Sequence, residues 1–372
     1  MQKIAIVSPR LPMGGAVGGA ETLLLNLARL AAEGGADVTF LTTCSTNRDG
    51  KWQNDMPAGE SVYEGLKVVR FPVDTGVELR GLGDVNSSAL LAHLAATPYD
   101  RLVTGPYLFG LVMAVAAAMP ERTILVPCVH DEEDARYPRV REMFRAVRGF
   151  CFNTEPERDL AARLYGPKIL SPDRPCGVVG FALPDFPSDP AAGRRLAGTD
   201  APYIIYCGRR DPMKGTPPVI DYWAAWRACH PDVDLKLVLT GIGDIEVPAN
   251  CRAHLIDLGD VADARQRHDL MAGAVAFCHA SVNESLSIVL LESWLARRPV
   301  LVHANGVVLR AQTKRANGGL WFRDFVDFNE CLEVLLRDPA LADALGASGR
   351  AFTLAEYSPD AVRRRFLETL AR

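Results

Sequence analysis

The stretch from Phe277 to Glu292 restricts the fold more than any other part of this sequence. It opens at the end of a small apolar run, 274–277, of the kind that forms a short buried strand. A polar turn, 281–285, comes next, and apolar residues from Ile288 onward then begin a helix. The sequence therefore predicts a strand, a turn and a helix in direct succession.

The polar residues of this turn suggest a binding site. Ser285 and Ser287 stand where the helix starts, and unpaired backbone N–H groups at such a position suit an anion. Glu284 precedes the helix and Glu292 lies about two turns into it. Because carboxylates repel phosphate, they would serve only to bind hydroxyls on either side of it, such as those of ribose and a hexose. The alternative is a capping acid and an exposed helix glutamate.

The N-terminal part has a similar order of segments. A buried strand is expected over 3–8, followed by a loop that contains Gly15, Gly18 and Gly19, and then an amphipathic helix over 22–33. This order is typical of the start of a doubly wound α/β domain, and the glycines would let backbone N–H groups approach a phosphate or sugar. The spacing is not G-x-G-x-x-G, so an NAD fingerprint is not supported. A purely structural glycine turn is the alternative.

Three further polar positions follow predicted strands. His130 comes after a strand at 123–126, at the mouth of an open sheet where ligands bind, unless a loop carbonyl satisfies it. Arg209 and Lys214 are five residues apart across a Gly/Pro turn after another strand, so they could converge on one pyrophosphate. Two exposed loop cations are the alternative. Gly241 begins a small turn that lets backbone approach the same place.

Composition excludes several classes of protein. The 41 basic and 45 acidic residues nearly balance, which argues against a nucleic-acid binder. The nine cysteines form no CxxC pair, so neither a zinc site nor a disulfide framework is expected. This pattern favours a reducing cytoplasmic setting. No signal peptide or apolar run of transmembrane length is present. An arginine-rich helix near 136–148 is read as a solvated face, with peripheral membrane contact as the alternative.

Taken together and in this order, the Gly-rich loop, the histidine, the Arg/Lys pair and the Glu-x7-Glu spacing resemble the retaining family-4 glycosyltransferases of GT-B fold. The resemblance covers nearly the whole chain. It implies an α/β protein with two Rossmann-like doubly wound domains facing a central cleft. We expect an N-terminal acceptor-side domain at 1–182, a Pro/Gly-rich linker at 183–200, a nucleotide-sugar domain at 201–356, and a helix at 357–372 that packs back on the first domain.

The resemblance also implies roles for individual residues. Catalytic roles would belong to Glu284 at the donor hexose, to His130 as a hexose or transition-state contact, and to Arg209 and Lys214 at the leaving diphosphate. Glu292 would bind the ribose hydroxyls. The remaining donor-binding residues would be Ser285, Leu286, Ser287, Gly15, Gly18, Gly19, Gly241 and, toward the nucleobase, Val261. The family often has glycine where this chain has Ser287, which affects the room around the sugar.

The expected activity is transfer of a hexosyl unit, with retention, from a nucleotide-diphosphate sugar to an acceptor hydroxyl. No cofactor and no metal are expected. The nucleotide sugar is a co-substrate, with UDP- and GDP-sugars favoured, and the acceptor is a saccharide, a lipid-linked molecule or a small molecule. The oligomeric state stays open.

Three alternatives stay open. A nucleotide-sugar epimerase of the same architecture would need further acid/base carboxylates. An NAD-dependent oxidoreductase would need the dinucleotide fingerprint that this chain lacks. A catalytically silent partner of another transferase would keep the fold without the activity.

Overall fold

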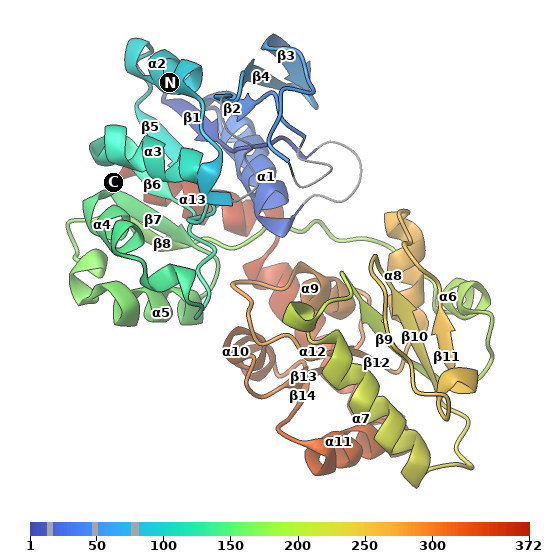
Figure 1. The fold of residues 1–372 in the computed structure, drawn as a ribbon. Helices are drawn as coiled ribbons and strands as arrows, with labels where there is room; N and C mark the ends of the chain where they lie inside the picture. The colour runs from blue at the N-terminus through green and yellow to red at the C-terminus, as the bar shows by residue number, and fades with distance from the viewer. Residues whose placement is uncertain (13–17, 47–50, 76–81) are drawn as a thin grey trace. The chain divides into compact units, whose positions relative to one another are not determined.

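The computed structural model describes residues 1–12, 18–46, 51–75 and 82–372 (Figure 1). The chain folds into two compact units. The first comprises Met1–Ala182 together with Pro359–Arg372, and the second comprises Leu183–Ser358. In the described part of the chain, no helix is both long enough and apolar enough to cross a membrane.

The first unit is built on a sheet whose strands lie in the order β3-β4-β2-β1-β5-β6-β7-β8. Every neighbouring pair is parallel except β3 with β4. The helices and strands of this unit are β1 (Lys3–Val7), α1 (Gly19–Glu33), β2 (Asp37–Thr43), β3 (Gly59–Tyr63), β4 (Leu66–Phe71), α2 (Ser88–Ala96), β5 (Arg101–Thr104), α3 (Gly110–Ala118), β6 (Thr123–Leu125), α4 (Pro138–Ala146), β7 (Gly149–Phe152), α5 (Glu155–Tyr165), β8 (Cys176–Val178) and α13 (Pro359–Ala371).

Strand β1 shows why helices must cover both faces of this sheet. Its apolar residues follow one another without a polar break, and successive side chains of a strand point to opposite faces. Ala5 and Val7 belong to an apolar cluster with residues of α2 and α3. Ile4 and Ile6 point the other way and are equally buried, on the face that α1 covers.

The C-terminal helix α13 belongs to the first unit. It packs against α1, β7 and β8, and Figure 1 shows the red helix beside the blue one. The Arg365 guanidinium donates to the Val179 carbonyl at 2.9 Å, and the Leu370 carbonyl accepts from Arg101 at 3.1 Å. A Cβ on Gly177 would lie 2.1 Å from the Thr369 hydroxyl, so the close contact depends on glycine there.

The second unit has an all-parallel sheet in the order β11-β10-β9-β12-β13-β14. The helices and strands of this unit are α6 (Pro190–Ala197), β9 (Tyr203–Cys207), α7 (Thr216–Cys229), β10 (Lys236–Thr240), β11 (Leu255–Asp257), α8 (Ala264–Gly273), β12 (Ala276–His279), α9 (Ile288–Leu295), β13 (Val300–His303), α10 (Val307–Ala316), β14 (Gly319–Phe322), α11 (Phe325–Arg337) and α12 (Pro339–Glu356).

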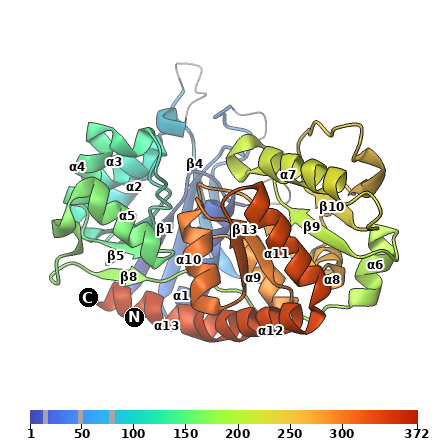
Figure 2. The same ribbon diagram turned by 90° about the horizontal axis from the view of Figure 1, so that it is seen from below.

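Strand β9 divides the core of the second unit into two layers. Ile204 and Tyr206 face a cluster formed with α7 and α11, whereas Tyr203, Ile205 and Cys207 face a cluster formed with α8 and α9. Helix α9 is itself backed by α12, as Figure 2 shows. The predicted α/β class with two doubly wound units is confirmed.

Three segments differ from what the sequence predicts. The polar, glycine-bearing stretch 47–65 predicts a surface connection, but it contains strand β3. The Pro/Gly-rich stretch 183–200, read as a linker, contains helix α6, which packs against α8. The stretch 178–181 predicts the last strand of the first unit, but the strand there, β8, ends at Val178.

Candidate active site

The loop after β9 is held against the turn after β12. Gly215 ends the short turn Pro212–Lys214 in left-handed backbone, with φ of +70°. A Cβ at Gly215 would lie 2.2 Å from the carbonyl carbon of Ala280, so only glycine allows this approach. The Ser281 hydroxyl donates to the Met213 carbonyl at 3.1 Å. Two segments far apart in sequence are thereby fixed side by side.

This contact brings Lys214 and Glu284 together. The Lys214 Nζ lies 2.7 Å from Glu284 Oε1, and the Glu284 side chain is only 9% exposed. His279, the last residue of β12, places its Nε2 3.5 Å from the same oxygen. Burial alone would raise the pKa of Glu284, but the His279 hydrogen bond and the Lys214 charge outweigh it and lower that pKa to about 2. Glu284 is therefore ionised at neutral pH and accepts hydrogen bonds.

The two adjacent arginines have different surroundings. Arg210 is buried, and its guanidinium donates to both carboxylate oxygens of Asp257, with Nη1 2.7 Å from Oδ2. That pairing holds the pKa of Asp257 below its usual value. The Arg209 side chain is 64% exposed and pairs with Asp211 in the same loop. Arg210 is thus held by its ion pair with Asp257 at the end of β11, whereas Arg209 faces solvent.

Ser287 defines where α9 starts. Its hydroxyl accepts from the Leu290 N–H as an N-cap, so the helix begins at Ile288 rather than at Ser285. Ser285 is buried and Leu286 is half-buried against the core that α9 shares with α8. Glu284 lies four residues before the first residue of α9, close in sequence to the end where helix N–H groups lack partners within the helix.

Glu292 lies further along α9 beside an unexpected partner. Its Oε1 is 3.6 Å from Nε2 of His268 on α8, and both side chains are mostly buried. The His268 ring stacks on Phe186, with ring centroids 3.4 Å apart and planes 8° from parallel. Neither His268 nor His279 was predicted from the sequence. No local pattern marks His268, but the position of His279 at a strand end is a signal that could have found it.

The remaining predicted donor residues of this unit follow β10 and β11. Gly241 has φ of +125°, and a Cβ there would lie 1.9 Å from the Gly208 carbonyl oxygen. Its N–H donates to the Gly259 carbonyl at 2.7 Å. The Val261 carbonyl accepts from Arg267 of α8 at 2.9 Å. All these segments follow the carboxyl ends of neighbouring parallel strands, so they share one edge of the sheet.

His130 lies in the first unit, in the loop after β6. Its Nδ1 is 3.7 Å from Glu132 Oε1, which accepts a hydrogen bond from the Tyr107 hydroxyl at 2.6 Å. The loop is held by Glu157, whose carboxylate accepts from the backbone N–H of Val129 at 2.8 Å. Burial raises the pKa of Glu157 to about 8, although the backbone hydrogen bonds that it accepts act to lower it. Glu157 was not predicted from the sequence, although Thr154-x-x-Glu157 has the spacing of a capping box.

At the N-terminus of α1, Gly18 is the residue before the helix and Gly19 is its first residue. The buried Glu21 carboxylate folds back over this end, 2.6 Å from where a Cβ of Gly18 would lie, and it pairs with Arg10 at 2.7 Å. Gly15 lies outside the described residues.

The chain contains one Asp-x-Asp tripeptide, 232–234, a pattern associated with metal binding. It precedes β10, at the sheet edge opposite the candidate site, and Asp234 pairs with Lys236 at 2.7 Å. Among the described residues, no three His, Cys, Asp or Glu side chains are grouped as a metal site. The nine cysteines are free thiols.

Comparisons with known proteins identify the family of this chain. Residues 201–338 match the family described as glycosyl transferases group 1, and residues 18–170 match the glycosyl transferase 4-like domain.

Two curated relatives are named as sugar-transferring enzymes. The mouse alpha-1,3/1,6-mannosyltransferase ALG2 is 31% identical over 108 residues, which is 29% of this chain and 26% of that protein. This chain thus matches only about a quarter of that relative. The D-inositol 3-phosphate glycosyltransferase 1 of Catenulispora acidiphila is 26% identical over 90% of this chain and 86% of its own length.

Among solved structures, sucrose-phosphate synthase from Thermosynechococcus elongatus superposes with a TM-score of 0.76 at 18% identity, covering 99% of this chain and 98% of that one. This likeness concerns the fold, and it confirms the GT-B prediction. With both family models matching in sequence order, the chain belongs to the glycosyl transferases group 1 of GT-B fold.

Proposed function

We propose that this protein transfers a hexosyl unit from a nucleotide-diphosphate sugar to an acceptor hydroxyl, with retention at the anomeric carbon and without a metal ion. The donor would lie along the carboxyl edge of the second unit's sheet. The UDP- and GDP-sugars are the favoured donors, and no separate cofactor takes part.

The observation that carries the proposal is the contact between Lys214 and Glu284, at 2.7 Å. It joins a cation that suits a diphosphate to an ionised carboxylate that suits sugar hydroxyls. A diphosphate beside Lys214 would place the attached hexose beside Glu284. Because the pKa of Glu284 is about 2, the carboxylate accepts hydrogen bonds from the hexose throughout the neutral range.

Charge neutralisation of the leaving diphosphate supplies the chemistry. As the anomeric C–O bond breaks, negative charge grows on the β-phosphate. Lys214, the exposed Arg209 and the N–H groups at the start of α9 would stabilise that charge, and fixed donors of this kind contribute about 3–4 kcal/mol each in other enzymes. Glu284 is paired with a lysine and is not placed as a nucleophile. We therefore favour attack from the same face as departure, with the leaving phosphate oxygen taking the acceptor proton.

Glu292 is assigned to the ribose of the donor. A carboxylate that accepts from both ribose hydroxyls gains two charge-assisted hydrogen bonds. His268 lies 3.6 Å from Glu292 and stacks on Phe186, which would hold the carboxylate in one orientation. His130 and the loop fixed by Glu157 are assigned to the hexose and acceptor side.

The acceptor is proposed only as a class. The curated relatives are named for transfer to D-inositol 3-phosphate and for mannosyl transfer, so a polyol, a saccharide or a lipid-linked saccharide is the first choice for assay.

A thermal-shift panel of UDP-, GDP-, ADP- and dTDP-sugars tests the donor site. A ligand at about 100 times its Kd adds about 2.7 kcal/mol to the free energy of unfolding. We expect one nucleotide sugar to stabilise the wild type and to lose this effect in Glu292→Ala. The control variant is Glu330→Ala, which removes an exposed carboxylate from α11 of the same unit.

Transfer itself is then measured with the donor so identified. Product formation that requires an acceptor, persists in EDTA and retains the anomeric configuration by NMR supports the full proposal. Conversion of the donor without any acceptor would indicate an epimerase instead. If no nucleotide sugar stabilises the folded protein at millimolar concentration, the donor site is wrongly assigned and a silent partner becomes the better hypothesis.

A further inference from the structure

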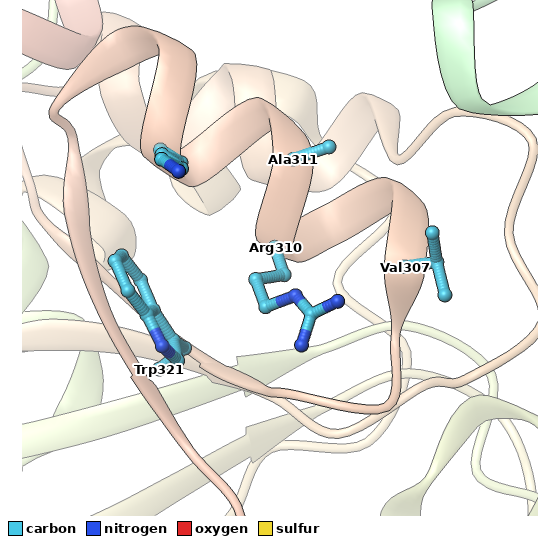
Figure 3. A pocket seen from close by; sticks show the side chains of 5 residues that line it. Val307, Arg310, Ala311 and Trp321 are labelled. Carbon is cyan, nitrogen blue, oxygen red and sulfur yellow. The ribbon is translucent and has the colours of Figure 1, made fainter.

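A pocket lies between α10 and β14 (Figure 3). Its volume is about 400 Å³, within the range of about 300–1,000 Å³ that is usual for small-molecule sites. Strand β14 is the outer strand of the sheet, two positions from β12. The five side chains that line the pocket are Val307, Arg310, Ala311, Lys314 and Trp321.

The periodicity of α10 explains why these side chains face outward. Four α10 residues at other positions, Val308, Leu309, Gln312 and Thr313, are buried toward the sheet. The lining residues of α10 share the opposite face at i, i+3, i+4 and i+7 spacing. In Figure 3 the Arg310 guanidinium lies between the side chains of Val307 and Trp321.

The pocket leaves two cations and an indole ring available. In residues 1–12, 18–46, 51–75 and 82–372, the side chains of Arg310 and Lys314 have no ion-pair or hydrogen-bond partner. Arg315 on the same helix, by contrast, pairs with Glu356 at 3.9 Å. Trp321 is 41% exposed, whereas the other four tryptophans of the chain are buried, namely Trp52, Trp223, Trp226 and Trp294.

The chemistry of the lining restricts what can bind. Arginine, lysine and tryptophan supply hydrogen-bond donors, and no lining side chain supplies a hydroxyl, an amide or a carboxylate as an acceptor. Sugar hydroxyls need acceptors as well as donors, so a bare sugar fits poorly. A mononucleotide offers a flat base for the apolar face and a phosphate for the cations, and both of these partners are present here.

We propose that this pocket binds a mononucleotide, with the base stacked on Trp321 and the phosphate held by Arg310 and Lys314. Its lining residues differ from those of the proposed donor site, which follow β9 and β12. Since no acceptor lines the pocket, base edges are not read in full and the four common bases bind with similar affinity. A donor site, in contrast, selects its base.

Acrylamide quenching of tryptophan fluorescence tests the proposal in the full-length protein. Because Trp321 is the exposed indole, a ligand stacked on it lowers the quenching constant, and occupation of the donor site has no exposed indole to protect. We expect AMP, GMP, CMP and UMP to protect with apparent affinities within about fivefold. Ribose 5-phosphate and inorganic phosphate should each bind at least about tenfold more weakly, because stacking contributes about 1–3 kcal/mol. Adenosine should also bind at least about tenfold more weakly, because it lacks the phosphate that the two cations hold.

Charge variants complete the test. Protection by AMP is expected to weaken at least about tenfold in Arg310→Gln/Lys314→Gln, since two charge-assisted contacts are lost. The control variant Arg315→Gln changes the charge of the same helix outside the pocket and should behave as the wild type. The proposal is overturned if no mononucleotide protects at millimolar concentration, if ribose 5-phosphate protects as well as AMP, or if one base is preferred more than about tenfold. Protection by a phosphotyrosine peptide alone would likewise overturn it.

Discussion

Replacing Gly349 with alanine should destabilise the second unit, although the same change normally favours a helix. Gly349 lies in the middle of α12, where alanine is better than glycine by about 1 kcal/mol in an exposed position. Here the added Cβ would lie 2.2 Å from Cδ1 and 2.4 Å from Cγ of Trp294. Real side chains do not approach so closely, so the helix or the indole must move.

The indole of Trp294 has little room to move. It is fully buried, its Nε1–H donates to the Gly318 carbonyl at 2.7 Å, and a Cβ on Gly318 would lie 2.4 Å from the same nitrogen. Overpacking of this kind costs about 1–3 kcal/mol, occasionally more. With contacts this short we take the upper part of that range. After the helix-propensity gain, a net loss of about 2 kcal/mol in the free energy of unfolding remains.

The measurement is thermal unfolding followed by tryptophan fluorescence, because four of the five tryptophans lie in the second unit. For a unit of this size, a loss of about 2 kcal/mol lowers Tm by about 4–8 °C. The control, Ala344→Gly, changes an exposed residue of the same helix and should cost about 1 kcal/mol. In a Trp294→Leu background, the penalty of Gly349→Ala should largely disappear. An increase in Tm for Gly349→Ala alone would refute the reasoning.

Three further outcomes are expected. Asp257→Asn leaves the buried Arg210 without its anionic partner and should cost about 1–3 kcal/mol, less than for a fully buried pair because Asp257 is partly exposed. The pKa of Asp257 is lowered in the folded state, so its contribution to the free energy of unfolding is complete at neutral pH and is lost as the pH falls into the acid range. The urea midpoint of the variant should therefore fall less between pH 7 and pH 3 than that of the wild type. His268→Gln should raise the KM for the donor several-fold with little change in kcat, because it frees Glu292 to reorient; an equal fall in kcat would point to a chemical role. Gly177→Ala should lower the thermal stability of the first unit, since its Cβ would meet Thr369 of α13, whereas Thr369→Ser removes only a methyl group and should have a smaller effect.

Local patterns in the sequence predicted most of the strands that carry the site. Short apolar runs such as those in 203–207 and 300–303 are typical of strands buried on both faces of a parallel sheet, and both are strands at those bounds. Strand β3 lacked this signal, because it is an edge strand whose Val62 is 76% exposed. Its residues alternate without an apolar face, so composition alone suggested a loop.

Helix α6 was missed for a different reason. Its proline and glycine content suggested a linker, but Pro190 is the first residue of the helix and Asp189 caps it by accepting from the Ala191 N–H at 2.8 Å. These are helix-start signals that a purely compositional reading overlooks. Gly193 within it allows close contact with Asp269 of α8, where a Cβ would lie 1.9 Å from the carbonyl oxygen.

The site itself could be predicted only in part. Spacing identified Lys214 and Glu284 as separate candidates, but their contact depends on the approach of Gly215 to Ala280, which involves residues far apart in sequence. The difference between Arg209 and Arg210 likewise depends on Asp257, at the end of another strand. Partners such as His268, which act across two helices, have no signature in a single sequence.

The place of α13 affects the order in which the protein can fold during synthesis. Residues of the second unit are contiguous, 183–358, so all of them have been translated before the last helix is made. In the first unit, that helix covers α1 and the neighbouring strands. The side chain of Gln2, near the start of the same unit, donates to the carbonyl of Leu370 in the helix at 3.4 Å. Although domains generally fold in the order of their synthesis, the N-terminal unit of this chain completes its structure last, once residue 371 has left the ribosome. Until then the apolar surface that α13 covers is open to chaperones.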